Sequence, residues 1–245
     1  WTTTDSIIVD GPIMGILSTP EVASLIFDHP SGGTLTLNNN ASVLTLSQSA
    51  LLVSSDTTSD VTISGGQLMT KNSVFDAKNE LIITNLSAAK LTLSANLGTS
   101  NTYLSATQNI TFAGPGLIEL TGSSSATAAN TAGTIAAFNN LTVTINGDVL
   151  LSSVNALGAY SYVSIGAAAE TTANGARLSL NGGTAVIGRL LGGRGGDPTY
   201  SELGPGEVAL GANGNLTLNQ ITDSTYSGLI SGTGVIVKKG AATLT

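Results

Sequence analysis

The chain has 245 residues, of which 41% are hydrophobic, 4% aromatic and 9% charged, and 30 are glycine. Its net charge of −7, with only eight Lys and Arg, argues against a nucleic-acid partner and against charge-driven binding to a membrane surface. Low charge with ordinary hydrophobicity argues against disorder, and few aromatic side chains argue against an ordinary globular core. We therefore expect a long, narrow aliphatic core in a single domain, residues 1–245.

Cysteine is absent, which excludes disulfides, thiolate metal sites and cysteine nucleophiles. This absence arises by chance in a chain of small residues, or it is typical of an exported protein that has to remain free of disulfide cross-links while it crosses a membrane. No apolar run approaches the length of a transmembrane helix. The sequence does not open with a basic segment followed by an apolar one, so we expect any export signal to have been removed.

Short strands dominate the chain. The N-terminal segment, as far as Ala23, suggests a strand at Ser6–Val9, a break at Gly11-Pro12 and one helical turn capped by Thr19. From Ser24 onward, pieces such as Leu35-Thr36-Leu37 alternate apolar and polar residues, so leucines face a core and threonines face solvent. The predicted strands as far as Leu120 are Ser24–Phe27, Thr34–Leu37, Val43–Leu46, Leu51–Val53, Val61–Ile63, Gln67–Met69, Leu81–Thr84, Lys90–Leu93, Thr102–Leu104, Asn109–Phe112 and Leu117–Leu120. Those that follow are Leu141–Ile145, Val149–Leu151, Tyr162–Ile165, Arg177–Leu180, Ala185–Ile187, Val208–Leu210, Asn215–Leu218, Leu229–Ile230, Val235–Val237 and Thr243–Thr245.

The spacing of these strands favours a parallel β-helix over a β-sandwich. The strands are short, and two-residue hairpin signals are rare between them. Similar motifs return after about one expected coil, roughly twenty residues: Val61–Ile63 resembles Ile82–Thr84, and Leu91 resembles Ile110. We therefore predict an all-β parallel β-helix with about three short strands per coil.

Three segments interrupt the rhythm and are predicted to be loop excursions: residues 122–137, 166–176 and 188–207. Because loops carry binding on a rigid scaffold, we expect function there. The third segment is the most charged and is the candidate binding loop. Its candidate residues are Arg189, Arg194, Asp197, Tyr200, Glu202 and Glu207.

Catalysis finds little support in the sequence. The single histidine, His29, follows Asp28 in a turn, and no serine elbow is close enough to complete a relay. One histidine without cysteine excludes a His-rich metal site, and we expect no metal or cofactor. Acidic pairs in turns, Asp56 with Asp60 and Asp76 with Glu80, are most simply explained as keeping strand edges solvated.

A polysaccharide-active β-helix is the alternative function, since such enzymes use acidic residues clustered on one face. It requires Asp197, Glu202 or Glu207 to meet Asp148 or Glu119 in one groove. A second alternative is a fibre-forming structural subunit, because an open terminal strand is a template for another chain.

The C-terminal segment from Tyr226 to Thr245 carries a family resemblance. It begins Tyr-Ser-Gly-Leu-Ile-Ser-Gly-Thr-Gly-Val-Ile-Val-Lys-Lys-Gly, which resembles the passenger-associated strand repeat of bacterial autotransporters, roughly Tyr-x-Gly-x-Ile-x-Gly-x-Gly-x-Leu-x-Lys-x-Gly. The chain departs from this pattern at Val237, an extra apolar residue, and at Ala242, where the repeat has Gly. The matching residues are Tyr226, Gly228, Ile230, Gly232, Gly234, Lys238, Gly240, Thr243 and Leu244.

The resemblance implies a right-handed parallel β-helix that is exported through the outer membrane to the bacterial cell surface. It also implies a non-enzymatic adhesin or scaffold, and it supplies no catalytic residues. The partners it implies are a host or neighbouring-cell surface, through glycan or protein, or another copy through the β-helix ends. Because Leu244 faces inward on an open strand, we expect the chain to be part of a longer one.

Overall fold

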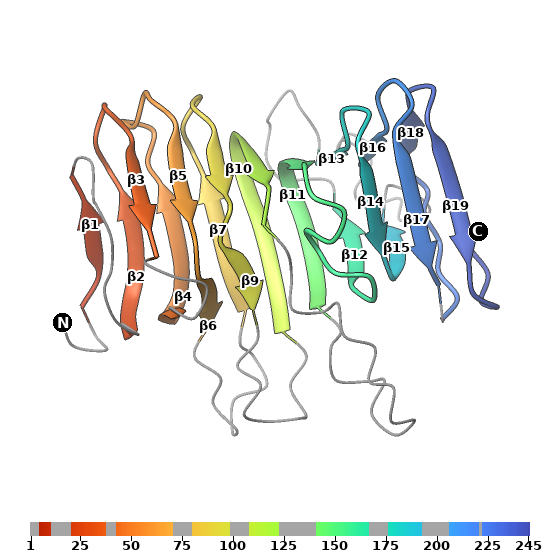
Figure 1. Cartoon of the computed structure of the whole chain (residues 1–245), viewed down its shortest axis with the longest axis horizontal. Helices are drawn as coiled ribbons and strands as arrows, with labels where there is room; N and C mark the ends of the chain where they lie inside the picture. The colour runs from red at the N-terminus through yellow and green to blue at the C-terminus, as the bar shows by residue number, and fades with distance from the viewer. Residues whose placement is uncertain are drawn as a thin grey trace, which may run out of the picture.

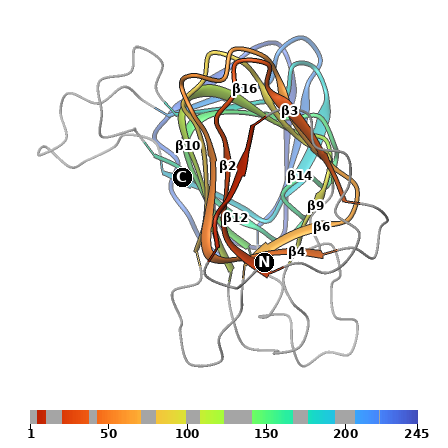
Figure 2. The same cartoon turned by 90° about the vertical axis from the view of Figure 1, so that its left-hand side faces the viewer.

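The computed structural model describes residues 5–10, 21–37, 43–70, 80–98, 108–122, 141–166, 176–192, 206–220 and 222–245. The described residues form strands, turns and bends, and no helix occurs among them. The strands pair in parallel, each with the strand of the next coil, and line up along the long axis of the molecule (Figure 1). Viewed along that axis, successive coils superimpose as a closed ring (Figure 2). The fold is therefore a parallel β-solenoid, as the sequence predicts.

Each coil contributes to up to three parallel ladders, which form three faces. The first ladder contains β1 (Ile7–Val9), β2 (Glu21–Phe27), β4 (Val43–Val53), β7 (Glu80–Asn85), β10 (Gln108–Leu120), β11 (Leu141–Leu151), β12 (Tyr162–Ile165) and β15 (Arg189–Gly192). The second contains β3 (Gly33–Thr36), β5 (Val61–Ser64), β8 (Leu91–Leu93), the ends of β10 and β11, β13 (Arg177–Ser179), β16 (Glu207–Ala209) and β18 (Leu229–Ser231). The third contains the starts of β2 and β4, then β6 (Gln67–Thr70) and β9 (Asn96–Gly98), and resumes with β14 (Thr184–Ile187), β17 (Asn215–Asn219) and β19 (Val235–Lys239).

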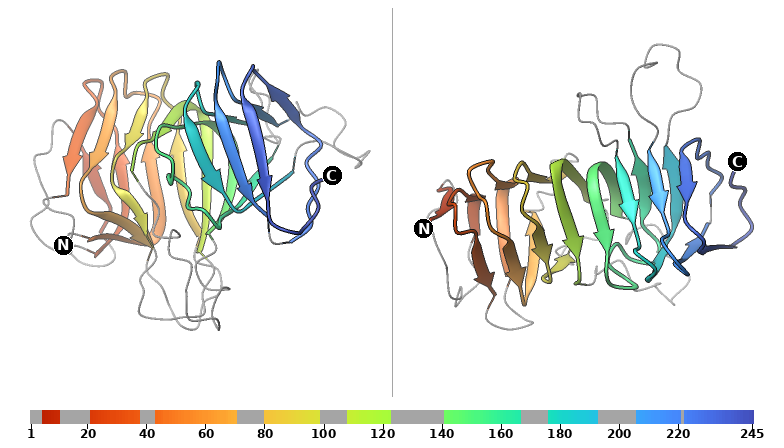
Figure 3. Two further views of the ribbon diagram at one scale, coloured as in Figure 1. Left: turned by 45° about the vertical axis from the view of Figure 1, so that its right-hand side comes forward. Right: turned by 90° about the horizontal axis from the view of Figure 1, so that it is seen from above.

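The core is a stack of aliphatic side chains inside the ring. The alternation predicted from the sequence is seen directly in the second ladder, where Leu35, Ile63 and Leu93 lie in register with almost no exposed surface. The threonines between them point outward. One cluster of buried residues extends from Ile7 to Leu218, so the coils share a single continuous core. Side views show the coils stacked without a break between the two ends (Figure 3).

The predicted coil length is too short for most of the solenoid. Val61 pairs with Leu91, further along the chain than the look-alike strand Ile82–Thr84. Leu91 in turn pairs with Ile118, not with Ile110. The look-alike motifs lie on different faces of the solenoid, and strands on all faces carry the same alternation. Coils approach the expected length where Ile7 pairs with Leu25, where Ile145 pairs with Ile165, and towards the C-terminal end, where Val208 pairs with Ile230.

Several predicted boundaries also differ. Strands β9 and β15 were not predicted, and Val43–Leu46 and Leu51–Val53 belong to one bent strand, β4. Glu21 lies in β2 rather than in a helical turn. The excursion predicted at 188–207 is shorter, because Arg189–Gly192 and Glu207 are in strands. The strand predicted at 102–104 lies outside the described residues.

Candidate functional site

The structure separates the two described residues of the candidate binding loop. Arg194, Asp197, Tyr200 and Glu202 lie outside the described residues. Arg189 opens β15 on the first ladder, whereas Glu207 opens β16 on the second. The candidate site is therefore not one cluster of six residues in the described structure.

Arg189 belongs to the first face. Its guanidinium lies over the ring of Tyr162, 5.5 Å from the centroid, in register one coil away. It also donates a hydrogen bond to the carbonyl of Asp223. These contacts tie neighbouring coils together, and the cation–π contact contributes on the order of 1 kcal/mol at such a half-exposed position.

Glu207 ends a row of three charged side chains on the second face. Asp148, Arg177 and Glu207 occupy matching positions of successive coils. Arg177 Nε lies 3.3 Å from Glu207 Oε2, and the Ser231 hydroxyl donates to Glu207 Oε1. Burial raises the pKa of the Tyr226 hydroxyl, and the nearby Glu207 carboxylate raises it further. Glu207 thus links three consecutive coils.

Asp148 is the least satisfied member of this row. Its Oδ1 is buried and has no hydrogen-bond partner among the described residues. Partial burial raises its pKa, Arg177 opposes the shift, and Glu207 adds to it. The structure therefore places Asp148 and Glu207 in one row, on either side of Arg177.

A second charged set lies on the same face nearer the N-terminus. Lys90 Nζ is 2.6 Å from Glu119 Oε2, and the backbone N–H of Lys90 donates to Asp60 Oδ1. The Ser152 hydroxyl donates to Glu119 Oε1 at 2.7 Å. Lys90 and then Ser152 hold the pKa of Glu119 below its ordinary value, while the bond to Glu119 raises the pKa of Lys90.

We expect Glu119→Gln to lower the free energy of unfolding at pH 7 by at most about 1 kcal/mol, because the pair is partly exposed. Glu119 stabilises the fold above the ordinary carboxylate pKa and loses this effect as the pH falls through its lowered value. Lys90 loses its effect as the pH rises above its ordinary value. The decrease in the free energy of unfolding caused by Glu119→Gln should therefore have its full size between about pH 5 and pH 10 and become smaller outside that range. Urea denaturation across pH tests this, with exposed Asp56→Asn as the control; equal losses at pH 3 and pH 7 would contradict it.

This charged face carries a signal that sequence analysis missed. Charged residues follow one another along this face at intervals of 29 or 30 residues. Two of these steps are bridged by hydrogen bonds, from Lys90 to Glu119 and from Lys90 to Asp60. The members of the series are Asp60, Lys90, Glu119, Asp148, Arg177 and Glu207. The registers of Val61 with Leu91, of Asp148 with Arg177 and of Arg177 with Glu207 have the same interval, whereas other coils are shorter or longer. In a sequence with so few charges, their spacing marks the repeat better than the abundant apolar motifs do.

The other polar candidates have structural roles. Asp28 accepts a hydrogen bond from the Ser54 hydroxyl, and His29 Nδ1 accepts one from the backbone N–H of Ser31. His29 Nε2 lies 3.5 Å from Asp10, so no relay with Asp28 is formed. Glu80 accepts from Thr111 in the next coil, and Asp76 lies outside the described residues. Within the described part of the chain, no three His, Asp or Glu side chains gather as metal ligands.

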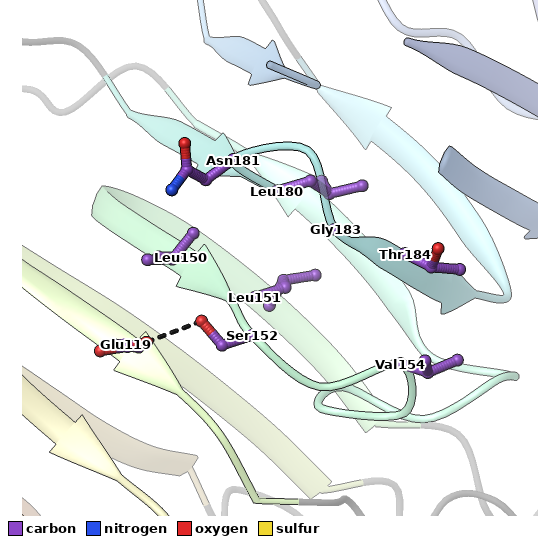
Figure 4. A pocket seen from close by; sticks show the side chains of 9 residues that line it. All are labelled: Glu119, Leu150, Leu151, Ser152, Val154, Leu180, Asn181, Gly183 and Thr184. Atoms are coloured by element: carbon purple, nitrogen blue, oxygen red, sulfur yellow. Dashed lines mark hydrogen bonds between the residues drawn. The ribbon is translucent and has the colours of Figure 1, made fainter. Parts of the chain in front are cut away.

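A cavity of about 490 Å³ opens beside Glu119, and nothing in the sequence indicates it. It lies where the third ladder is interrupted: between β9 and β14, the described chain has no strand on this face. In place of a strand, residues 152–161 form successive turns, with hydrogen bonds such as Ala156 N–H to the Ser153 carbonyl. The lining residues, shown in Figure 4, are Glu119, Leu150, Leu151, Ser152, Val154, Leu180, Asn181, Gly183 and Thr184.

The residues of the C-terminal motif build the last coil. The Tyr226 hydroxyl donates to the carbonyls of Gly206 and Leu229 and fixes one corner. Ile230 stacks on buried Val208 but is 45% exposed, and Leu244 is partly buried against the core. Lys238 occupies the register position of buried Leu218 and donates to the Gly240 carbonyl. The remaining motif residues Gly228, Gly232, Gly234 and Thr243 lie at the corners of the same coil.

No helix long and apolar enough to cross a membrane occurs in the described ranges. Comparison with protein-family models, with curated proteins and with solved structures gives no match. The likeness of Tyr226–Gly240 to the autotransporter repeat therefore stays a prediction, whereas the parallel β-solenoid rests on the structure itself.

Proposed function

We propose that this chain is a non-enzymatic, extracellular β-solenoid scaffold that presents loops for attachment to a cell surface, in the manner of an autotransporter passenger. The observation that carries the proposal is the tolerance of one corner to long insertions. This corner joins the first face to the second. It takes up only residues 86–90 between β7 and β8, but it takes up residues 166–176 between β12 and β13 and residues 193–206 between β15 and β16. The register of β12 with β15 and of β13 with β16 is unbroken.

This arrangement suits display. The two long segments start and end at the same corner in successive coils, so their bases are one coil, about 4.8 Å, apart. At their base Arg177 lies between Asp148 and Glu207 and pairs with Glu207. The charged and aromatic residues of 193–205, Arg194, Asp197, Tyr200 and Glu202, thus follow a rigid, paired stretch of the solenoid.

Replacing residues 193–205 with a Gly/Ser segment of equal length is expected to weaken attachment to target cells at least about tenfold, as removal of a binding hot spot does. The far-UV circular dichroism spectrum and the thermal midpoint should change little. Residues 123–140 contain no charge, and their replacement by Gly/Ser is the matched control. Full attachment by a variant in which residues 123–140, 167–175 and 193–205 are all replaced would contradict the proposal.

The polysaccharide-active alternative is favoured by one observation, the half-buried Asp148 in a row with Glu207. Two coil steps of about 4.8 Å separate these residues, close to the upper limit of about 9.5 Å for paired carboxyl groups in inverting glycosidases. Arg177 lies between them and pairs with Glu207, and the cavity is lined by neither acid. Release of reducing sugars from a polysaccharide, lost in Asp148→Asn, would replace the scaffold proposal with this one.

A further inference from the structure

We propose that the cavity beside Glu119 binds a neutral, hydroxyl-rich ligand, such as a hexose unit of a glycan. This site is formed by the scaffold itself and does not depend on the segments 166–176 and 193–206. Its volume of about 490 Å³ lies within the range of about 300–1,000 Å³ common for small-ligand sites. The lining residue Val154 belongs to residues 152–161, which form turns in the described chain where other coils have a strand of the third ladder.

The charge of the cavity excludes most other ligand classes. No Lys, Arg or His is among its described lining residues, so no cationic side chain of the lining can bind an anion, and the one nearby ammonium, Lys90, is already paired with Glu119. That carboxylate is already bound by Lys90 and Ser152, which leaves no free acidic group for a cation. A neutral ligand is the class that remains.

The lining combines hydrogen-bonding groups with aliphatic surface. Asn181 and Thr184 form no side-chain hydrogen bond within the described structure, so the Asn181 amide and the Thr184 hydroxyl can serve a ligand. Both are exposed, on opposite sides of the β13–β14 turn (Figure 4). Val154, another lining residue, is 46% exposed and lies in the turns of residues 152–161. Sugar rings present hydroxyls at their edges and C–H groups on their faces, and this mixed surface matches both.

The test uses the whole chain with ¹³C-labelled methyl groups, titrated with glucose, galactose, N-acetylglucosamine and, as an anionic probe, galacturonate. We expect at least one neutral sugar to shift the methyl signals of Val154 and Leu150, with the millimolar affinity typical of so small a ligand. Thr184→Val and Asn181→Gly should each weaken binding about 2- to 10-fold, the effect of losing one hydrogen bond.

Matched controls exist one coil further on. Asn213, with φ of 64°, occupies a turn like that of Asn181, with φ of 47°, and Thr217 lies on the neighbouring strand of the same small sheet as Thr184. Asn213→Gly and Thr217→Val should bind like the unaltered chain, and the methyl spectrum reports whether each variant is folded. The proposal is overturned if no neutral sugar shifts Val154 and Leu150, if galacturonate binds more tightly, or if the controls weaken binding as much as the site variants.

Discussion

Replacing Asn85 with leucine is expected to lower the free energy of unfolding by about 3–5 kcal/mol. Asn85 is fully buried at the corner between the first and second ladders. Its amide donates hydrogen bonds to the carbonyls of Ala89 and Leu117, at 2.8 and 3.0 Å, and its Oδ1 accepts from the backbone N–H of Ser87. Leucine fills the same space but leaves three backbone groups unpaired, each costing about 1–3 kcal/mol.

The bonds of Asn85 reach across coils, which makes the effect larger than that of an ordinary turn residue. Ala89 belongs to its own turn, but Leu117 lies 32 residues further on, in the next coil. Ser87 extends the network back to the preceding coil, where its hydroxyl donates to the carbonyl of Thr57. We infer that this polar corner holds three coils in register.

Equilibrium urea denaturation, followed by far-UV circular dichroism, measures the change. Asn213→Gly is the control, because Asn213 is exposed and makes no side-chain hydrogen bond in the described structure; its effect should stay within about 0.5 kcal/mol. Asn85→Asp keeps the acceptor for Ser87 but loses both amide donations, so it should be destabilising as well. A loss below about 1 kcal/mol for Asn85→Leu would show that the corner carbonyls find other partners.

The fold class was predictable because the period-two alternation depends only on local residues. In Leu35-Thr36-Leu37 the alternation alone indicates which side chains face the core, and no information about any other coil is needed. Coil length was not predictable from these motifs, since Val61–Ile63 resembles strands on every face and its true partner is Leu91–Leu93. Strand β9 was missed because Asn96-Leu97-Gly98 offers a single apolar residue between two turn formers.

The candidate sites were less predictable than the fold. Arg189 and Glu207 are close in the sequence, but they belong to different faces, because the chain turns a corner between them. Glu119 and Thr184 are distant in the sequence, and they share a cavity where the described chain has turns in place of a third-ladder strand. Such a gap arises from how coils stack, and no local pattern encodes it.

Gly114→Ala is the second substitution for which we expect a large effect, a loss of about 4 kcal/mol or more in the free energy of unfolding. Gly114 lies where β10 turns from the first face to the second, with φ of 96°, a conformation that costs an L-residue about 1–2 kcal/mol. An added Cβ would stand 2.2 Å from the carbonyl oxygen of Asn85 and 2.7 Å from its carbon. These are backbone atoms of the neighbouring coil, so the clash can be relieved only if the paired strands of the ladder move apart.

Gly166→Ala separates this clash from the general cost of altering a corner glycine. There the Cβ would meet only the side-chain Oδ1 of Asn146 at 2.5 Å, with the next atom at 3.7 Å, and that side chain can rotate away. The expected loss is below about 1 kcal/mol, measured by the same denaturation experiment. Because Gly114 and Asn85 are in contact, Gly114→Ala combined with Asn85→Leu should cost less than the sum of the two single losses. Equal losses in Gly114→Ala and Gly166→Ala would contradict this explanation, since of the two glycines it is Gly114 that lies against the backbone of the preceding coil.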